Sequence, residues 1–291
     1  MIRRWMPKRP AAAHKGDFGH ALIIAGSRGM VGAGVLSAWG ALRGGSGLVT
    51  LATVRSQQAA AAAHLRPEAM TLALRETSGG SVYAGGVSEA LRWMRRRRIT
   101  SLVIGPGLSR SAEAAQFVRN LLRRLQSDPM NLRGIVLDAD GFLAMGPKGL
   151  LSNTLPLIVT PHPGELSKFT GRSVGSSRSE RISAAAKFAK LYRVICVLKG
   201  SGTVVSDGVR SYVNPTGNPG MARGGSGDVL SGLISALIGQ FGTSLYLLRA
   251  ACIGVYVHGL AGDLAAAQKS RIAMLPGDLA ERIPSAFKKL I

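Results

Sequence analysis

The stretch HALIIAGSRGMVGAGVLSAWGALRGGSGLVTLA, residues 20–52, indicates the fold class of this chain. Its first part, residues 20–25, is a short apolar run between glycines, which is typical of a buried strand. A glycine-rich loop over residues 26–34 leads into an expected helix over 33–43, which ends at a pair of glycines. Residues 47–52 form the next apolar run. A strand, a helix and a second strand in this order predict a parallel βαβ unit.

The same alternation continues through the rest of the chain. Further strands are expected over residues 101–105, 134–140, 156–160 and 194–200, helices over 112–126, 179–190, 227–238 and 245–268, and a hairpin over 203–213. Strands that alternate with helices predict an α/β fold, with a mainly parallel sheet covered by helices on both faces. No repeat or composition break divides the chain. We therefore expect one domain over residues 16–291, preceded by a basic leader over residues 1–15.

The composition predicts a folded protein with a full hydrophobic core. The chain has 291 residues, of which 46% are hydrophobic. Cys196 and Cys252 lie inside apolar runs and form no C-x-x-C pair, so neither a zinc site nor a disulfide framework is indicated. After the basic leader, no apolar stretch has the length of a signal peptide or a membrane span. A cytoplasmic protein without a membrane partner is expected.

The net charge is strongly positive: 37 Lys and Arg against 15 Asp and Glu give +22. Such a surface attracts nucleotides, nucleic acid or anionic lipid. The densest run consists of four arginines at residues 95–98, and a smaller basic cluster lies within residues 3–9. Charge runs usually face water, and the chain has no zinc-finger spacing or aromatic-rich RNA-binding pattern. A solvated helix end is therefore favoured over a nucleic-acid site.

The segment NPTGNPGMARGGSGDVLSG, residues 214–232, is the strongest candidate in the chain for anion binding and catalysis. A glycine-rich loop that runs into an apolar helix can direct several backbone N–H groups at an anion, and the helix N-terminus adds partial positive charge. Asp228 falls in the first turn of that helix, where a carboxylate can accept a proton from a substrate hydroxyl. An isolated Gly-Asp would simply cap the helix, but the glycines before Asp228 favour a catalytic role.

Loops after other expected strands carry polar residues that have more than one interpretation. Asp138 and Asp140 suit a metal or a hydroxyl partner, although an Asp-Gly turn also explains Asp140. His162, between two prolines, suits either a ligand contact or a turn. Glu165 suits a magnesium-bound water or the cap of a helix that begins near Leu166, and both alternatives stay open.

Two further observations concern the nucleotide and the last helix. No Gly-Lys dipeptide occurs, which excludes a Walker A loop, and the glycines of residues 26–34 do not form G-x-G-x-x-G. A nucleotide must therefore be held in another way. His258 and Asp263, which flank HGLAGD, are expected to serve core packing and helix termination.

Taken together, these motifs resemble one family. The resemblance is carried by GDFGHALIIAGSRGMVGAGVLSA, GPGL, DAD, TPHPGE, LKGSGTVV, NPTGNPGMARGGSGD and HGLAGD, in family order. The chain resembles the ADP-dependent NAD(P)H-hydrate dehydratases, which are relatives of ribokinase and of hydroxyethylthiazole kinases. The resemblance covers residues 15–291 and implies a ribokinase-like fold.

The resemblance also implies roles for individual residues. Asp228 matches the catalytic aspartate, which contacts the hydrated nicotinamide. Further substrate contacts are implied for Ala33, Gly107 and His162. Nucleotide contacts are implied for Lys199, Gly200, Ser201, Gly202, Thr203 and Gly227. No metal ligand is assigned.

The implied reaction is the ADP-dependent dehydration of the S epimer of NADHX or NADPHX to NADH or NADPH, which gives AMP and phosphate. ADP is the co-substrate and Mg²⁺ the cofactor. Many bacterial members carry an epimerase domain ahead of this one, and only a short leader precedes Gly16 here. The epimerase activity is therefore expected to be absent from this chain and to come from a separate protein in the same pathway. A homo-oligomer is also expected.

One departure from the family pattern falls in the glycine-rich loop. Arg223 stands where the family usually has Thr, and its guanidinium could grip phosphate oxygens or face solvent.

Two rival functions also stay open. A ribokinase-like kinase for a vitamin precursor would share the base and the anion loop, although PHPGE and NPTGNPGMA favour the dehydratase. A basic nucleic-acid-binding protein is supported by the net charge alone.

Overall fold

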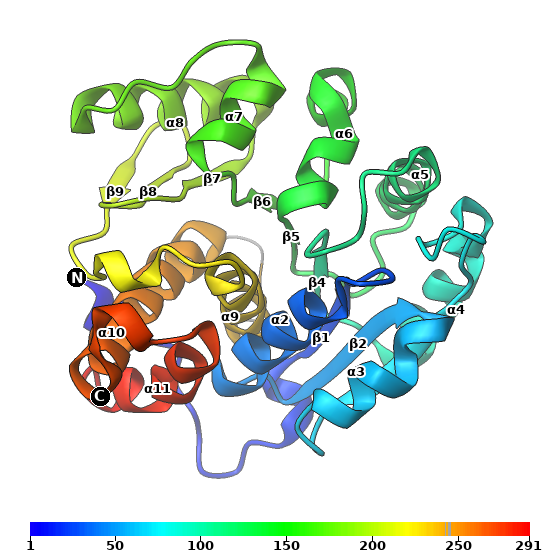
Figure 1. The fold of residues 1–291 in the computed structure, drawn as a ribbon, viewed down its shortest axis with the longest axis horizontal. Helices are drawn as coiled ribbons and strands as arrows, with labels where there is room; N and C mark the ends of the chain where they lie inside the picture. Colours follow the sequence, from blue (N-terminus) through cyan, green and yellow to red (C-terminus); the bar gives the residue numbers. More distant parts are fainter. Residues whose placement is uncertain (242, 244–245) are drawn as a thin grey trace.

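The computed structural model describes residues 1–241, 243 and 246–291 (Figure 1). Its described strands form one nine-stranded sheet in the order β3-β2-β1-β4-β5-β6-β7-β8-β9. The strands from β1 to β7 are parallel, and β8 and β9 add an antiparallel hairpin at one edge. The strand bounds are β1 His20–Ile24, β2 Leu48–Val54, β3 Met70–Leu74, β4 Ser101–Ile104, β5 Gly134–Leu137, β6 Leu157–Val159, β7 Ile195–Leu198, β8 Val204–Ser206 and β9 Ser211–Val213.

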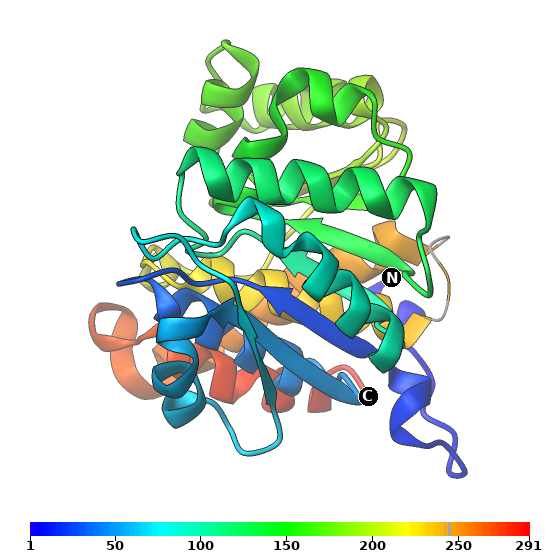
Figure 2. The same cartoon turned by 90° about the vertical axis from the view of Figure 1, so that its right-hand side faces the viewer.

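Helices cover both faces of the sheet (Figures 1 and 2). Their bounds are α1 Ile2–Trp5, α2 Val31–Arg43, α3 Gln58–His64, α4 Val87–Arg97, α5 Ala112–Ser127, α6 Ala139–Leu151, α7 Pro163–Thr170, α8 Arg178–Tyr192, α9 Ser226–Phe241, α10 Leu247–Ala273 and α11 Pro276–Lys288. One hydrophobic core joins the sheet to α4 through α8, and a second core joins it to α2, α3 and α9 through α11. The predicted α/β architecture is confirmed.

Alternate residues of β1 show how the sheet divides the two cores. Leu22 and Ile24 belong to the core under α4 through α8, whereas Ala21 and Ile23 belong to the opposite core. Successive side chains of a strand point to opposite faces, so a strand buried on both faces is apolar throughout. All five residues of β1 are buried, and the four that follow His20 are apolar, as this burial on both faces requires.

The packing of α2 against α9 brings two glycine-rich segments together. A Cβ atom on Gly40 would collide with the Val229 carbonyl, and one on Gly232 would collide with the Ser37 carbonyl. The two helices therefore approach as closely as their backbones allow. A buried hydrogen bond of 3.1 Å between the hydroxyls of Ser37 and Ser231 adds a polar contact across this interface. This contact fixes the amino end of α9 beside that of α2.

The strand order creates a crevice beside β1. In the sheet, β2 and β3 lie on one side of β1, and β4 and all later strands lie on the other side. Loops at the carboxyl ends of two strands that diverge in this way leave room for a ligand between them. The loops that follow β1, β4, β5, β6 and β7 all lie at this edge because the strands are parallel.

Some expected boundaries differ from the structure. The strand expected over residues 134–140 ends at Leu137, because Asp138 is the N-cap of α6 and Ala139 adopts a φ of 45°. The expected helix near Leu166 begins earlier, at Pro163. The expected start of the last long helix, Leu245, lies outside the described residues.

Several elements were not predicted. The sequence analysis missed β3 and the helices α1, α3, α6 and α11. Of α4 it expected only the end at the arginine run, and of α7 only a start near Leu166. The α6 segment is interrupted by Gly146, with a φ of 59°, and by Pro147, which hides its helical pattern. α11 carries Pro284 in its interior. Proline and glycine inside an element weaken the local pattern, and packing against the sheet compensates for this.

The predicted solvated helix end at the arginine run is confirmed. α4 ends at Arg97, and Arg98 caps it in a left-handed conformation. All four arginines of residues 95–98 are exposed. Arg95 forms an ion pair of 2.6 Å with Asp128, so part of the charge is balanced within the protein. Basic side chains in the last helical turn also complement the helix dipole.

The N-terminal segment packs against the body of the protein. Ile2 on α1 is buried in the same core as α10, and Arg3 donates a hydrogen bond of 2.9 Å to the Ile291 carbonyl. The guanidinium of Arg9 lies 3.9 Å from the centroid of the Phe18 ring. α10 is long and apolar enough to cross a membrane by length and composition, but 67% of its most apolar window is buried inside the fold. It therefore serves as a core helix.

Candidate active site

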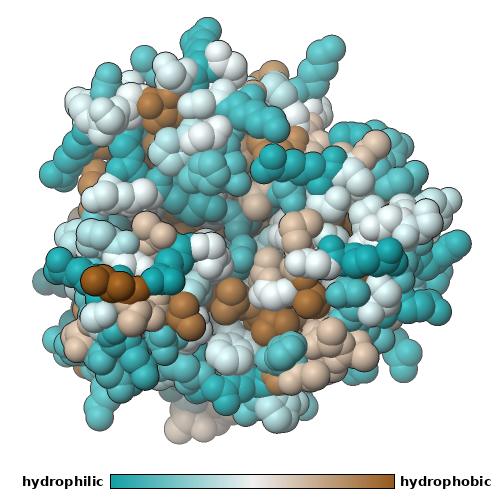
Figure 3. All heavy atoms as spheres, in the orientation of Figure 1, coloured by the Kyte–Doolittle hydropathy of each residue, from teal (hydrophilic) through white to brown (hydrophobic). Residues whose placement is uncertain are grey.

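A cleft of about 700 Å³ lies at the switch in strand order beside β1. The loop after β1 and the start of α2 supply Met30 and Ala33, and the loop after β4 supplies Gly107. Asp140 on α6 and Asp228 on α9 complete the polar side of the wall. Figure 3 shows this face hollowed near its centre, with apolar residues gathered there and hydrophilic residues around them. The cleft therefore offers an apolar surface next to two carboxylates.

Asp228 is the carboxylate whose protonation is most strongly perturbed. It lies in the first turn of α9, and its carboxylate accepts no hydrogen bond from the described residues. The Asp228 pKa is raised to about 7: burial is the largest cause, the negative charges of Asp138 and Glu165 add to it, and the positive charge of Lys199 opposes them. A carboxylate with a pKa near neutrality can take up and release a proton at physiological pH.

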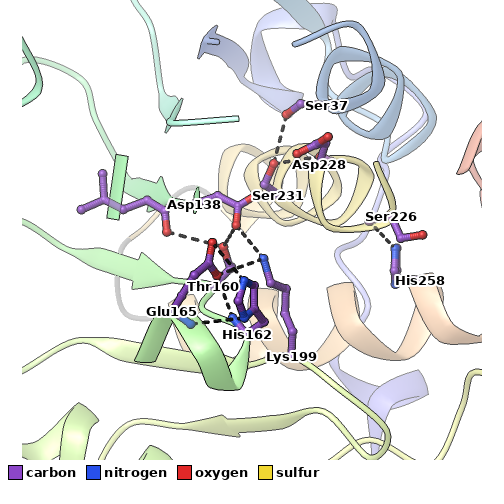
Figure 4. A network of polar contacts seen from close by, with 11 residues as sticks. Ser37, Asp138, Thr160, His162, Glu165, Lys199, Ser226, Asp228, Ser231 and His258 are labelled. Atoms are coloured by element: carbon purple, nitrogen blue, oxygen red, sulfur yellow. Dashed lines mark hydrogen bonds and ion pairs between the residues drawn. The ribbon is translucent and has the colours of Figure 1, made fainter. Parts of the chain in front are cut away.

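Lys199 joins the carboxylates that surround Asp228. Its Nζ lies 2.9 Å from Asp138 Oδ1 and 3.8 Å from Glu165 Oε2 (Figure 4). Burial alone would lower the Lys199 pKa, but the charges of Asp138 and Glu165 outweigh it, so the pKa is raised and the ammonium stays charged. Thr160 donates a hydrogen bond of 2.7 Å to the same Asp138 oxygen. The buried Asp138 thus has two donors.

The interpretation of Glu165 as a helix cap is supported by the geometry at α7. The backbone N–H of His162 donates to Glu165 Oε2 at 2.8 Å, and the N–H of Glu165 donates to His162 Nδ1 at 3.2 Å. These reciprocal bonds form a capping box. His162, expected as a substrate contact, is exposed at this cap and does not line the cleft beside Asp228.

The segment after β7 forms a turn rich in backbone hydrogen-bonding groups. Lys199 N–H donates to the Pro161 carbonyl at 2.8 Å, and the Thr203 hydroxyl donates to the Gly200 carbonyl at 3.0 Å. Gly200 has a φ of 137° and Gly202 a φ of 62°, conformations that side chains disfavour. Residues 199–203 therefore turn sharply at the edge of the sheet.

Gly227 allows the ammonium of Lys199 to approach α9. A Cβ atom at Gly227 would lie 3.2 Å from Lys199 Nζ, closer than ordinary contacts allow. The ammonium therefore lies against the amino end of the helix that carries Asp228. This arrangement brings the loop after β7 and the loop before α9 to one place.

The glycine-rich loop before α9 is held by two residues of α10. Asp263 accepts hydrogen bonds of 2.9 Å from the Gly217 N–H and from the Asn218 side chain. His258 Nε2 donates to the Ser226 carbonyl at 2.9 Å, and burial lowers the His258 pKa to about 4, so the ring stays neutral. Core packing of His258 is confirmed. Helix termination at Asp263 is wrong, because α10 continues to Ala273 and Asp263 binds the loop.

Arg223 does not line the described wall of the cleft. Its side chain is exposed, and its Nη2 donates to the carbonyl of Ile272 at the end of α10. The structure therefore favours the surface interpretation of Arg223 over the phosphate contact. The Asp140 carboxylate, which the sequence left open between a metal or hydroxyl partner and a turn, accepts hydrogen bonds from the Ser109 N–H at 3.0 Å and from Arg110 Nε at 3.1 Å. It therefore holds the loop after β4 in place.

The carboxylates around Lys199 provide oxygen donors for a divalent cation. Within the described chain, no group of three or more His, Cys, Asp or Glu side chains is arranged to hold a metal ion. Mg²⁺ commonly keeps several waters and binds one or two carboxylates together with substrate phosphates. A cation would also offset the negative charges of Asp138 and Glu165, which add to the effect of burial on the Asp228 pKa. The site therefore fits a Mg²⁺ ion held mainly by phosphates, with help from Asp138 or Glu165.

The sequence model of the NAD(P)H-hydrate dehydratases matches residues 21–285. The chain belongs to this family. A solved structure supports the assignment: an ADP/ATP-dependent NAD(P)H-hydrate dehydratase from Bacillus subtilis, co-crystallised with ATP and Mg²⁺, is 29% identical with a TM-score of 0.82. The match covers 100% of this chain and 96% of that one. A ribokinase-like protein from Enterococcus faecalis, 25% identical with a TM-score of 0.79, confirms the ribokinase-like fold of this family member.

Curated relatives of this dehydratase family member are longer. The bifunctional NAD(P)H-hydrate repair enzyme of Moorella thermoacetica is 40% identical over 292 residues, which cover 99% of this chain and 53% of that protein. The enzyme of the same name from Escherichia coli is 36% identical, covering 96% of this chain and 49% of that protein. The chain thus spans about half the length of the curated relatives it matches.

Proposed function

We propose that this protein dehydrates the S epimer of NADHX or NADPHX to NADH or NADPH, with ADP as phosphoryl donor and Mg²⁺ as cofactor. Family membership supports the reaction type, and the names of the relatives refer to the repair of hydrated NAD(P)H. The observation that carries the proposal is the Asp228 carboxylate, which faces an apolar cleft with a pKa raised to about 7.

We assign the base to Asp228. The hydroxyl of the hydrate is a poor leaving group, and phosphorylation turns it into a good one. In the proposed step, Asp228 accepts the hydroxyl proton while the hydroxyl oxygen attacks the terminal phosphate of ADP, which releases AMP. Loss of the phosphate group from one ring carbon and of a proton from the adjacent ring carbon then forms the double bond and restores the dihydronicotinamide. Mg²⁺ would supply charge neutralisation at the phosphates.

The other residues divide between two ligands. We propose that Ala33 and Gly107 contact the hydrated nicotinamide, because both line the cleft with Asp228. His162 remains a proposed substrate contact at the rim of the site, beside Glu165. The ammonium of Lys199 would meet the phosphates of ADP.

Backbone groups would complete the nucleotide site. We assign the turn formed by Gly200, Ser201, Gly202 and Thr203, together with Gly227, to the nucleotide, because this turn and the amino end of α9 converge at Lys199. Backbone N–H groups and a helix N-terminus suit an anion. A site built from fixed backbone donors requires little reorganisation during the reaction.

One assay tests the function. Purified protein is incubated with hydrated NADH, Mg²⁺ and either ADP or ATP, and the absorbance of the dihydronicotinamide ring is followed over time. Recovery of the absorbance together with stoichiometric AMP and phosphate supports the dehydratase. A stable phosphorylated alcohol without recovery would instead support the rival kinase.

Several expectations remain predictions of the sequence. These are the cytoplasmic location, the homo-oligomeric state and the cooperation with an epimerase in the same pathway.

A separate measurement tests the rival function of nucleic-acid binding. Binding of oligonucleotides with a steep salt dependence would favour this alternative.

A further inference from the structure

Arg181, in the first turn of α8, binds the turn that follows β7. Its Nη2 donates to the carbonyls of Leu198 at 3.3 Å and Lys199 at 3.2 Å, and its Nη1 donates to the carbonyl of Ser201. The side chain is half-buried, and among the described residues no carboxylate pairs with it. One guanidinium therefore gathers three carbonyl groups from four consecutive residues.

The direction of these carbonyls determines where the neighbouring amides point. In a trans peptide the C=O of one residue and the N–H of the next point in opposite directions. Because the carbonyls of Lys199 and Ser201 face Arg181, the N–H groups of Gly200 and Gly202 face away from it. Neither N–H has a hydrogen-bond partner within the described chain, whereas the N–H of Lys199 is bound to Pro161. Two unpaired donors thus lie on the side of the turn opposite the guanidinium.

We propose that Arg181 is a positioning residue of the nucleotide site, which holds the 199–203 turn so that the amides of Gly200 and Gly202 bind the phosphates of a nucleoside diphosphate. The inference rests on the proposed function and extends it to a residue outside the ligand contacts. Without the guanidinium, three carbonyls would lose a cationic donor and the turn could rotate its peptide groups toward the phosphates. Carbonyl oxygens would then repel the ligand.

The chemistry of arginine and the conformation of Gly200 support this role. A planar guanidinium presents five donors in a rigid fork, so it can hold several carbonyls at once, whereas a lysine ammonium is a flexible point charge. A Cβ atom on Gly200 would lie 2.8 Å from Arg181 Nη2. Glycine at this position thus leaves room for the guanidinium as well as allowing the φ of 137°.

The test compares nucleotide binding in Arg181→Met and Arg181→Lys with the wild type. Calorimetric titration with ADP and Mg²⁺ is expected to show binding weakened about tenfold in Arg181→Met, equivalent to about 1.4 kcal/mol, with Arg181→Lys in between. Adenosine, which has no phosphate, should bind the three proteins equally. Arg178→Met, an exposed arginine of the same helix, is the matched control and should bind ADP as the wild type does.

Two readouts separate positioning from a general loss of structure. The KM for ADP should rise in Arg181→Met while the KM for hydrated NADH stays within about twofold. In ¹⁵N-glycine-labelled protein, ADP should shift the amide signals of Gly200 and Gly202 in the wild type and less in the variant. If Arg181→Met fails to fold, the same measurements on Arg181→Lys decide.

The outcomes also separate this inference from the proposed function. Equal ADP binding by Arg181→Met and the wild type, or an equal loss of adenosine and ADP binding, would overturn the positioning role alone. Failure of the wild type to bind ADP would overturn the proposed function and the inference together.

Discussion

Lys199 Nζ lies 2.9 Å from Asp138 Oδ1, although 61 residues separate the two in the chain. The pair joins the loop after β5 to the loop after β7, and it lies against the helix that carries Asp228. The charges of Asp138 and Lys199 act on the Asp228 pKa in opposite directions. Burial is the main cause of the raised Asp228 pKa, and the two charges of the ion pair adjust it.

The pH dependence of the reaction should reflect Asp228. Because the base must be ionised, kcat/KM is expected to rise with pH and level off, with a midpoint of about 7. Asp138→Asn removes a negative charge that raises the Asp228 pKa, so its midpoint should move to lower pH. Glu68→Gln, an exposed change, should leave the profile unaltered. A midpoint in Asp138→Asn equal to or above that of the wild type would refute this electrostatic coupling.

Asp228→Asn should abolish most of the turnover while it preserves the shape of the site. General-base removal usually costs about 10²- to 10⁴-fold in rate. ADP affinity should change little, because the proposed phosphate contacts come from other residues. A variant that retains more than half of the wild-type rate would remove Asp228 from the mechanism.

The same substitution should alter stability with a defined pH dependence. The folded-state pKa of Asp228, about 7, lies above its ordinary value of 3.8, so ionisation between these values favours the unfolded chain. The contribution of Asp228 to the free energy of unfolding therefore falls as pH rises from 3.8 through 7. The free energy of unfolding of Asp228→Asn, relative to that of the wild type, should therefore rise by about 1–3 kcal/mol from pH 4 to pH 8. Urea unfolding of both proteins at pH 4 and pH 8 measures this change. A relative free energy of unfolding that is higher at pH 4 than at pH 8 would contradict the prediction.

Lys199→Met should destabilise the fold and raise the Asp228 pKa further. Removing the ammonium leaves the buried Asp138 carboxylate without its cationic partner, and such losses typically cost about 3–5 kcal/mol. Lys187→Met, an exposed lysine of α8, serves as the control and should change the free energy of unfolding by less than about 0.5 kcal/mol. Chemical denaturation of both variants gives the comparison. Equal stabilities would show that the pair contributes nothing net.

Arg223→Thr should leave ADP affinity nearly unchanged. The Arg223 guanidinium is exposed and binds the Ile272 carbonyl, so its removal takes away a surface contact rather than a phosphate ligand. Titration of ADP into both proteins at low and moderate salt should give dissociation constants within about twofold, since exposed charge contacts contribute little. A salt-sensitive loss of affinity would restore the phosphate contact.

ADP should raise the melting temperature of the protein. A ligand that binds only the folded state stabilises it by mass action, by roughly 2.7 kcal/mol at about 100 times the dissociation constant. Differential scanning fluorimetry with ADP, AMP and adenosine measures the effect. If no adenine nucleotide shifts the transition, the nucleotide assignment fails.

The sequence by itself determined the class of fold, the family and the position of Asp228 at a helix start. Apolar runs, glycine punctuation and helical periodicity are local patterns, and local sterics and backbone hydrogen bonding translate them directly into strands and helices. The motif set, including GSGD and LKGSGTVV, was sufficient to indicate the family because each motif is continuous in the chain.

Only the tertiary structure decided which of these segments meet and what each polar side chain binds. The strand order places the loops after β1 and β4 around one cleft, and it brings Lys199 to Asp138 and Arg181 to the carbonyls beside Lys199. The sequence pattern gave Asp263 a helix-ending role, whereas the fold directs its carboxylate to Gly217. Contacts of this kind depend on how elements distant in sequence pack together, and the pattern of a single segment carries no information about its partner across the sheet.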